Sequence, residues 1–205
     1  MSKFKLTKGE LKRQRDALQQ YERYLPTLQL KKQQLQLEIL RQDVLRQERQ
    51  EHLAARKSAA AAWIGLLSKP ALDFRQMLKP RRVITDARNI AGVDVPVFKG
   101  VDFSFPEYDL FITPLWVDAV LEFFKEMVAL QEEIKVLESG IGILRRELRI
   151  TAQRVNLFEK VKIPEAKEAI RLIKIYLGDQ LTNAVGRSKI AKRKIEAQEL
   201  VEVLA

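Results

Sequence analysis

The second half of the chain carries a long run of apolar residues that recur in alternating steps of four and three. Such a sustained 3.5-residue period specifies a stripe that winds left-handed around a partner helix. The pattern therefore predicts a coiled-coil helix over residues 114–205. Twelve of the thirteen positions in the run are apolar, and together they are Trp116, Val120, Phe123, Met127, Leu130, Ile134, Leu137, Ile141, Leu144, Leu148, Thr151, Val155 and Phe158.

Prolines mark the start of this helix and a break within it. Thr113 is a suitable cap, and Pro114 suits the first helical position because its missing N–H is not needed there. Pro164 falls inside the helix, where a proline costs about 3 kcal/mol, so we expect a kink near it. The apolar pattern resumes beyond Pro164 and continues as far as Ala184.

The first half has the same character with a less regular stripe. Thr7 and Glu10 form a capping-box pattern, and leucines then recur at sevens, as in Leu11, Leu18 and Leu25, in Leu28 and Leu35, and in Leu30 and Leu37 followed by Val44. This predicts a coiled-coil helix within residues 1–80, interrupted near Pro26 and ended by Pro70 and Pro80.

Residues 81–113 differ from both helices. Apolar and polar residues alternate from Val95 to Phe105 around Lys99–Gly100, which predicts a β-hairpin with its turn at that dipeptide. Pro96 restricts its strand to a sheet edge. The fold class predicted is all-α, a long antiparallel two-helix left-handed coiled coil with a small β-hairpin knob between the helices.

Composition narrows the class of function. The chain has 205 residues, a formal net charge of +10 and no cysteine, so disulfides and thiolate chemistry are excluded. The N-terminus lacks the apolar core of a signal peptide, and we expect neither a transmembrane helix nor direct insertion into a membrane. The positive charge is compatible with nucleic acid, a membrane surface or an acidic protein partner.

Candidate catalytic residues are scarce. The single histidine, His52, lies in a polar helical stretch, and neither a phosphate-binding loop nor a metal-ligand spacing occurs. The carboxylates alternate with Lys and Arg along helix faces, which is typical of a solvated surface. We therefore predict a protein without catalytic activity, cofactor or metal.

Basic residues gather near both termini and again at Lys79–Arg82 with Arg88. In an antiparallel pair of helices the two terminal runs would lie at the same end. Few aromatic residues are interleaved with them for base stacking, and no nucleic-acid reader motif is present. A partner with acidic protein surfaces is an equally good explanation, and we expect no nucleic acid.

Several motifs resemble those of the D subunits of V-type and A-type rotary ATPases, which form the central shaft of those machines. The N-terminal motif is Thr7-Lys8 with Leu11. The second motif consists of Leu28, Lys31, Lys32 and Leu35. The most specific match is RVNLFEKVKIP, from Arg154 to Pro164, in which Arg154-Val155-Asn156, Glu159 and Ile163-Pro164 fit the family pattern. The resemblance covers essentially the whole chain.

The resemblance implies a rotor in which the terminal helices rise into the hexameric catalytic head and the middle segment sits at the foot. Implied partners are catalytic and non-catalytic head subunits, the small F subunit of the stalk and the membrane-ring connector, and the implied location is cytoplasmic and peripheral to the membrane. On this basis we expect head contacts from Lys8, Lys12, Arg13, Arg187, Lys189 and Arg193, and foot contacts from Val97, Phe98, Val101 and Phe103.

Two other classes remain open at this point. Prefoldin-like chaperones also join two long helices through β-hairpins, and a basic coiled coil can bind nucleic acid without sequence preference. The second of these would show a steep salt dependence of DNA binding. A shaft would instead form a stable complex with ATPase subunits.

Overall fold

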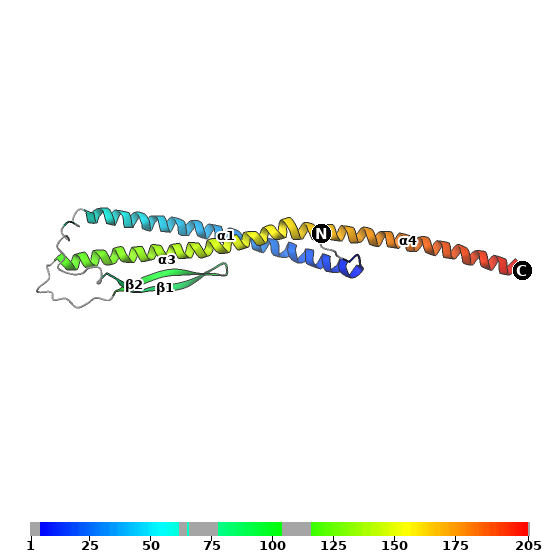
Figure 1. Cartoon of the computed structure of the whole chain (residues 1–205), viewed down its shortest axis with the longest axis horizontal. Helices are drawn as coiled ribbons and strands as arrows, with labels where there is room; N and C mark the ends of the chain where they lie inside the picture. Colours follow the sequence, from blue (N-terminus) through cyan, green and yellow to red (C-terminus); the bar gives the residue numbers. More distant parts are fainter. Residues whose placement is uncertain (1–4, 62–64, 66–77, 104–115, 205) are drawn as a thin grey trace. The chain divides into compact units, whose positions relative to one another are not determined.

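The computed structural model describes residues 5–61, 65, 78–103 and 116–204. Its elements are α1 (Lys8–Ala61), β1 (Pro80–Ile90), β2 (Val93–Phe103), α3 (Trp116–Leu157), the π-helical turn η2 (Phe158–Lys162) and α4 (Ile163–Leu204) (Figure 1). The predicted fold class, long helices with an antiparallel hairpin between them, is confirmed. Four residues used in the predictions, Pro70, Phe105, Thr113 and Pro114, lie outside the described residues.

The chain divides into two compact units, one formed by Met1–Gln29 with Gln153–Ala205 and the other by Leu30–Ala152. We call these the terminal unit and the central unit. Each contains part of α1 and part of the second helical stretch.

Helix α1 begins with the predicted cap, because the backbone N–H of Glu10 donates to Oγ1 of Thr7 at 3.3 Å. The predicted interruption at Pro26 is wrong, since α1 continues through that residue to Ala61. Pro26 and Glu22, four residues before it, are both exposed. Water can therefore hydrate the Glu22 carbonyl that a proline leaves without a donor.

In the central unit, α1 and α3 run antiparallel. Three ion pairs join them, Asp43 to Arg145 at 2.9 Å, Arg49 to Glu133 at 2.9 Å and Arg56 to Glu126 at 2.8 Å. Partner numbers fall on α3 as they rise on α1, which fixes the direction. Exposed pairs of this kind contribute at most about 1 kcal/mol each, so they specify register more than stability.

The hairpin is longer than predicted, and its turn lies elsewhere. Ile90 pairs with Val93, so the two-residue turn is Ala91–Gly92, and both residues have positive φ (51° and 78°). Two positive φ values are characteristic of a type I′ turn. The prediction of a turn at Lys99–Gly100 is wrong. Gly100 pairs with Ile84 and Phe98 with Thr85, which leaves Lys99 as the extra residue of a β-bulge within β2.

The turn end of the hairpin is packed onto the two helices of the central unit (Figure 1). Val93 and Val95 join Leu35 and Ile39 of α1 and Leu144 of α3 in one buried cluster. Gly140 of α3 makes this approach possible, because a Cβ there would stand 2.8 Å from Cγ1 of Val95. Apolar packing thus holds the hairpin on the helices, and it depends on the absence of a side chain at Gly140 of α3.

The terminal unit has its own buried stripe. Val155, Ala166, Ile170 and Ile173 are at most 9% exposed. The ring of Phe158 stacks on Tyr21 of α1 at 5.3 Å, and Lys167 pairs with Glu22 at 3.3 Å. The first segment of α1 therefore packs against the helix that contains Pro164.

The π-helical turn η2 ends just before Pro164. The N–H of Ile163 donates to the carbonyl of Phe158, five residues back instead of four. In a regular α-helix the ring of Pro164 would clash with the carbonyl of Lys160, which would also lose its donor. The wider π turn changes the path of the backbone at that carbonyl, and the helix continues through the proline as α4.

The π turn also corrects the phase of the buried stripe. A strict continuation of the four-three steps beyond Val155 would reach residues 158, 162, 165, 169, 172 and 176. Beyond the turn, however, Glu165, Leu172 and Tyr176 are exposed. Of the residues one position later, Ala166, Ile170 and Ile173 are buried and Leu177 is half-buried, and Ala169 on the original phase is buried as well. A π turn contains one residue more than an α turn, and this matches the offset of one residue.

Two glycines of α3 test how the hairpin is held. We predict that Gly142→Ala stabilises the chain by about 1 kcal/mol, because nothing lies within 4 Å of a Cβ there and alanine favours the helix. Gly140→Ala makes the same helical gain but forces Val95 to move, at a cost of about 1–3 kcal/mol. Chemical denaturation would measure both. Equal stabilisation by the two variants would show that the hairpin does not rest on Gly140.

A deletion tests the role of the π turn. Removing Lys160, which is exposed, makes η2 an α turn and keeps Ala166 and Ile173 on the buried stripe. Pro164 then clashes with a carbonyl, so we expect the deletion alone to cost about 3 kcal/mol. Adding Pro164→Ala to the deletion should restore most of that loss in thermal unfolding. If the double variant is no more stable than the deletion alone, then the additional residue of the π turn is not there to accommodate Pro164.

Candidate functional site

The basic residues predicted to face a partner all belong to the terminal unit. Lys8, Lys12 and Arg13 are exposed on α1, and the C-terminal set, Arg187, Lys189 and Arg193, is exposed on α4. Measured from the Glu22–Lys167 pair, Lys8 lies 14 residues before Glu22 and Arg187 lies 20 residues after Lys167. In antiparallel helices both runs extend in the same direction from that pair, with the α4 run farther from it.

Most of these cations are available to a partner. Arg13 has a weak ion pair with Glu10 at 4.0 Å, and Nε of Arg187 donates to the carbonyl of Asn183 at 3.4 Å. Within the described part of the chain, Lys8, Lys12, Lys189 and Arg193 form no ion pair. Exposed cations of this kind bind acidic surfaces weakly and depend on salt.

The α4 surface also carries apolar residues that the sequence analysis did not propose as contacts. Leu181, Val185, Ile190 and Ile195 are 55–61% exposed. The apolar pattern beyond Pro164 was a signal for them, since it runs on to Leu181 and Ala184. Basic and aliphatic residues thus share this segment, which suits a partner surface with both acidic and apolar parts.

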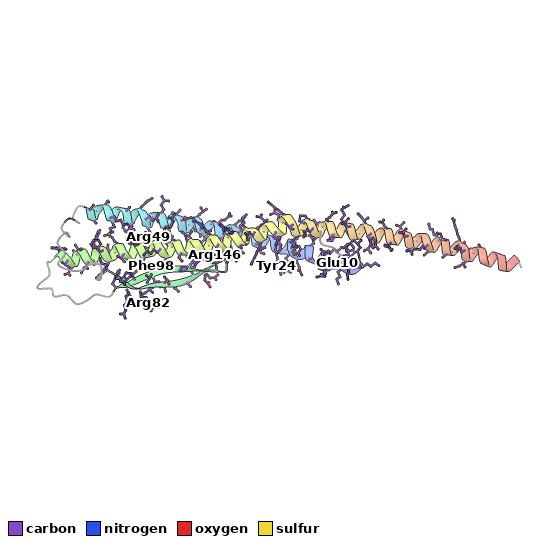
Figure 2. All side chains as sticks on the ribbon, in the orientation of Figure 1. Glu10, Tyr24, Arg49, Arg82, Phe98 and Arg146 are labelled. Atoms are coloured by element: carbon purple, nitrogen blue, oxygen red, sulfur yellow. The ribbon has the colours of Figure 1, made fainter. Side chains whose placement is uncertain are left out.

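The hairpin residues predicted as foot contacts do not form one patch. Cross-strand partners share a face, and Phe98 (opposite Thr85) and Val101 (opposite Val83) lie on the same face, with Phe103. Val97 lies on the other face, which also carries Ile84, and these two are 41% and 39% exposed. Phe98, Val101 and Phe103 are only half-buried. Figure 2 labels Phe98 and Arg82 on the hairpin, and the Arg82 side chain extends away from the helices.

An ion pair lies beside Val97 on the hairpin. Nζ of Lys99 is 2.7 Å from Oδ2 of Asp86, and the N–H of Ala87 donates to Oδ1 of the same carboxylate at 2.9 Å. The hydrogen bond from Lys99, followed by that from Ala87, lowers the pKa of Asp86 below its ordinary value. On α4, the pKa of Glu168 is lowered in the same way by its hydrogen bonds with Arg171. Both carboxylates are surface groups.

The described residues show few groups suited to bond-making chemistry. His52 is exposed on α1. Within residues 5–61, 78–103 and 116–204 no group of three or more His, Asp or Glu side chains could hold a metal ion. None of the helices found in these ranges has a stretch long and apolar enough to cross a membrane.

The described residues define a mostly helical protein with an antiparallel hairpin, and its α1 and α4 helices expose basic and apolar side chains. Comparison with known proteins identifies the family. The family model that describes the D subunit of ATP synthase matches residues 10–193. The chain therefore belongs to the family of ATP synthase D subunits.

Individual relatives agree with this assignment over nearly their whole length. The D subunit of the V-type ATP synthase of Borreliella burgdorferi is 46% identical over 195 residues, covering 95% of this chain and 96% of the relative. Its counterpart in the V-type ATP synthase of Chlamydia trachomatis serovar L2 is 36% identical over 197 residues, covering 95% and 97%. The counterpart in Chlamydia caviae is 34% identical over 197 residues, covering 95% of each chain.

Proposed function

We propose that this chain is the central stalk rotor of a V/A-type rotary ATPase. It transmits torque between the head, which hydrolyses or synthesises ATP, and the membrane ring that translocates ions. The observation that carries the proposal is the pairing of two long helices along buried apolar stripes in a member of the family of ATP synthase D subunits. ATP hydrolysis, ATP synthesis and ion transport are then activities of the complex to which the shaft belongs.

Torque transmission needs a body that resists bending and twisting, and helix pairing supplies this. Leu35 and Leu144 are completely buried where α1 meets α3, and Ile173 is completely buried in the terminal unit. Close-packed interiors deform little. Of the predicted seam, Ile134, Ile141, Leu144 and Val155 are buried, while Met127, Leu130, Leu137, Leu148 and Phe158 are half-buried.

The proposed shaft contributes no catalytic group. Its described carboxylates are largely surface groups, several of them paired with nearby cations, as Glu168 is with Arg171 at 2.6 Å and Glu165 with Lys162 at 3.3 Å. General acid–base catalysis needs a group held within hydrogen-bond reach of the substrate, and His52 lies exposed on the surface of α1. Nucleotide binding and bond cleavage belong to other subunits.

The partners proposed are those of a shaft. Lys8, Lys12, Arg13, Arg187, Lys189 and Arg193 contact catalytic and non-catalytic head subunits. The hairpin residues Val97, Phe98, Val101 and Phe103 contact the foot, where the small F subunit of the stalk and the membrane-ring connector are found. The proposed location is the cytoplasmic side, peripheral to the membrane, without nucleic acid and without direct insertion into the bilayer.

A buried-charge variant tests the shaft proposal. Leu144→Asp places an unpaired charge at a position with 0% exposure, which is strongly unfavourable and should unpair α1 from α3. In the ATPase reconstituted into vesicles, we expect ATP hydrolysis to continue while ions transported per ATP fall at least several-fold.

Two further variants interpret that result. Ile143→Asp adds the same charge at the neighbouring exposed position, 37% exposed, and should keep the transport ratio. Size exclusion would show whether the Leu144→Asp variant still assembles with the head and small stalk subunits. If it does not, Leu144→Ala is the milder variant, with a loss of about 2–5 kcal/mol in the free energy of unfolding, and its transport ratio should be intermediate. Circular dichroism of the isolated variant chain would show whether α1 and α3 have separated. An unchanged ratio of ions transported per ATP in a variant whose helices have separated would contradict the proposal.

A further inference from the structure

The hairpin is a sheet of two strands, so each strand has a free edge. The backbone N–H and C=O groups along such an edge can pair with a strand of another chain, and proteins normally protect their edges against this. Ile90 and Val93 flank a two-residue turn and therefore exchange backbone hydrogen bonds with each other. Every second pair along the strands does the same, and the residues between these pairs point their backbone groups outward.

The edge of β2 is interrupted in two ways. Its outward-pointing residues near the turn are Asp94, Pro96 and Phe98. Pro96 has no N–H to donate, and the bulge at Lys99 breaks the regular spacing of the strand. Prolines and bulges are common means of protecting an edge, so another strand cannot form a regular ladder along β2.

The edge of β1 has neither device between Thr85 and the turn. Its outward-pointing residues there are Thr85, Ala87 and Asn89, and their pairing with β2 is regular. All the residues from Thr85 to Asn89 are exposed. Ile84, which is 39% exposed, and Thr85 are β-branched, and such residues favour strands. This edge therefore has the properties of a strand that another strand can join.

A side chain closes the middle of this edge. The N–H of Ala87 donates to Oδ1 of Asp86 at 2.9 Å, and Oδ2 of the same carboxylate lies 2.7 Å from Nζ of Lys99. Lys99 is the extra residue of the bulge in β2, so the cation that holds the carboxylate comes from the opposite strand. An incoming strand would find the central donor of the edge already bonded and a charged acceptor beside it.

We propose that Asp86, held by Lys99, is an edge cap that prevents β1 from pairing with β1 of a second copy of this chain. The ion pair does little else for the fold. The two side chains are 57% and 60% exposed, and ion pairs so exposed contribute little to folding stability. Neither residue belongs to the buried cluster that holds the hairpin on the helices. The inference does not depend on whether the chain acts as a rotor.

The pairing that the edge cap prevents has a definite register. Two copies of β1 can pair antiparallel about a two-fold axis at Ala87, so that Ala87 of each copy exchanges both backbone hydrogen bonds with the other. This register needs the N–H that Asp86 occupies. Arg88 of the second copy would then stand opposite Asp86, but that exposed ion pair only replaces the one with Lys99 and adds little.

Disulfide trapping tests the edge cap, because the chain contains no cysteine. Ala87→Cys places a thiol at the centre of the pairing, where the two Cα atoms would be about 5.5 Å apart, a distance that a disulfide spans. With Asp86 intact we expect little disulfide-linked dimer after mild oxidation, measured by non-reducing electrophoresis. With Asp86→Thr in the same chain we expect at least roughly tenfold more, a factor that corresponds to about 1.4 kcal/mol.

Two further variants of the Ala87→Cys chain serve as controls. Asp102→Thr removes an exposed carboxylate from the same hairpin and changes the net charge equally, and it should leave the amount of dimer low. Asp86→Asn keeps an acceptor oxygen beside the Ala87 position but loses the charge attraction to Lys99, so its dimer should be intermediate. Circular dichroism of each reduced chain would show that the helices are intact.

Three results would overturn the proposal. Equal amounts of dimer with and without Asp86 would mean that the carboxylate does not close the edge. As much dimer from the Asp102 variant as from the Asp86→Thr variant would mean that loss of negative charge alone drives the association. Self-association of the Asp86→Thr chain in sedimentation, without a disulfide at residue 87, would show that two copies meet through another surface.

Discussion

A long helix in water draws most of its stability from packing its apolar stripe against other elements. In the central unit the stripe of α3 is covered by α1, and Leu144 lies completely buried between them with Leu35. The hairpin then closes the same cluster through Val93 and Val95, at the place where Gly140 leaves room for a strand. The packing of α1 on α3 therefore determines where the hairpin lies and which residues form the ion pairs between the two helices.

The same requirement explains the backbone around Pro164. Helix pairing constrains the phase of the apolar stripe, and the stripe beyond Pro164 is displaced by one residue from the stripe before it. The π turn η2 supplies the one additional residue and places the proline where no regular α turn precedes it. The RVNLFEKVKIP segment, which includes the turn, is therefore a joint between two stripes and not a defect in one.

Much of this fold could be predicted because the spacing of apolar residues along the sequence indicates which side chains are buried. Ile141 and Leu144 follow the four-three pattern, and the alternation after Val95 indicates a strand. The turn of the hairpin was misplaced because Gly100 is the more obvious turn residue, whereas Ala91 adopts a positive φ that its type rarely shows. Strand β1 was missed because its residues from Arg81 to Ile90 are exposed or half-buried and mostly polar.

The contact surfaces were less predictable for a physical reason. A pattern shows that Leu30, Leu37 and Val44 share a face of α1, but only coordinates show that this face is opposite the core. Lys189 and Arg193 were proposed as contacts from their charge alone. The aliphatic residues near them, such as Ile190, can be recognised as exposed only once the structure shows that α1 begins at Lys8.

The central claim is that this chain must turn relative to the head for the ATPase to work. The most direct measurement is a reversible lock, with Arg193→Cys in this cysteine-free chain joined by a disulfide to a cysteine introduced in the head. We predict that the locked complex loses both steady ATP turnover and ion transport, and that reduction of the disulfide restores both. A locked complex that continues to couple hydrolysis to transport would contradict the account.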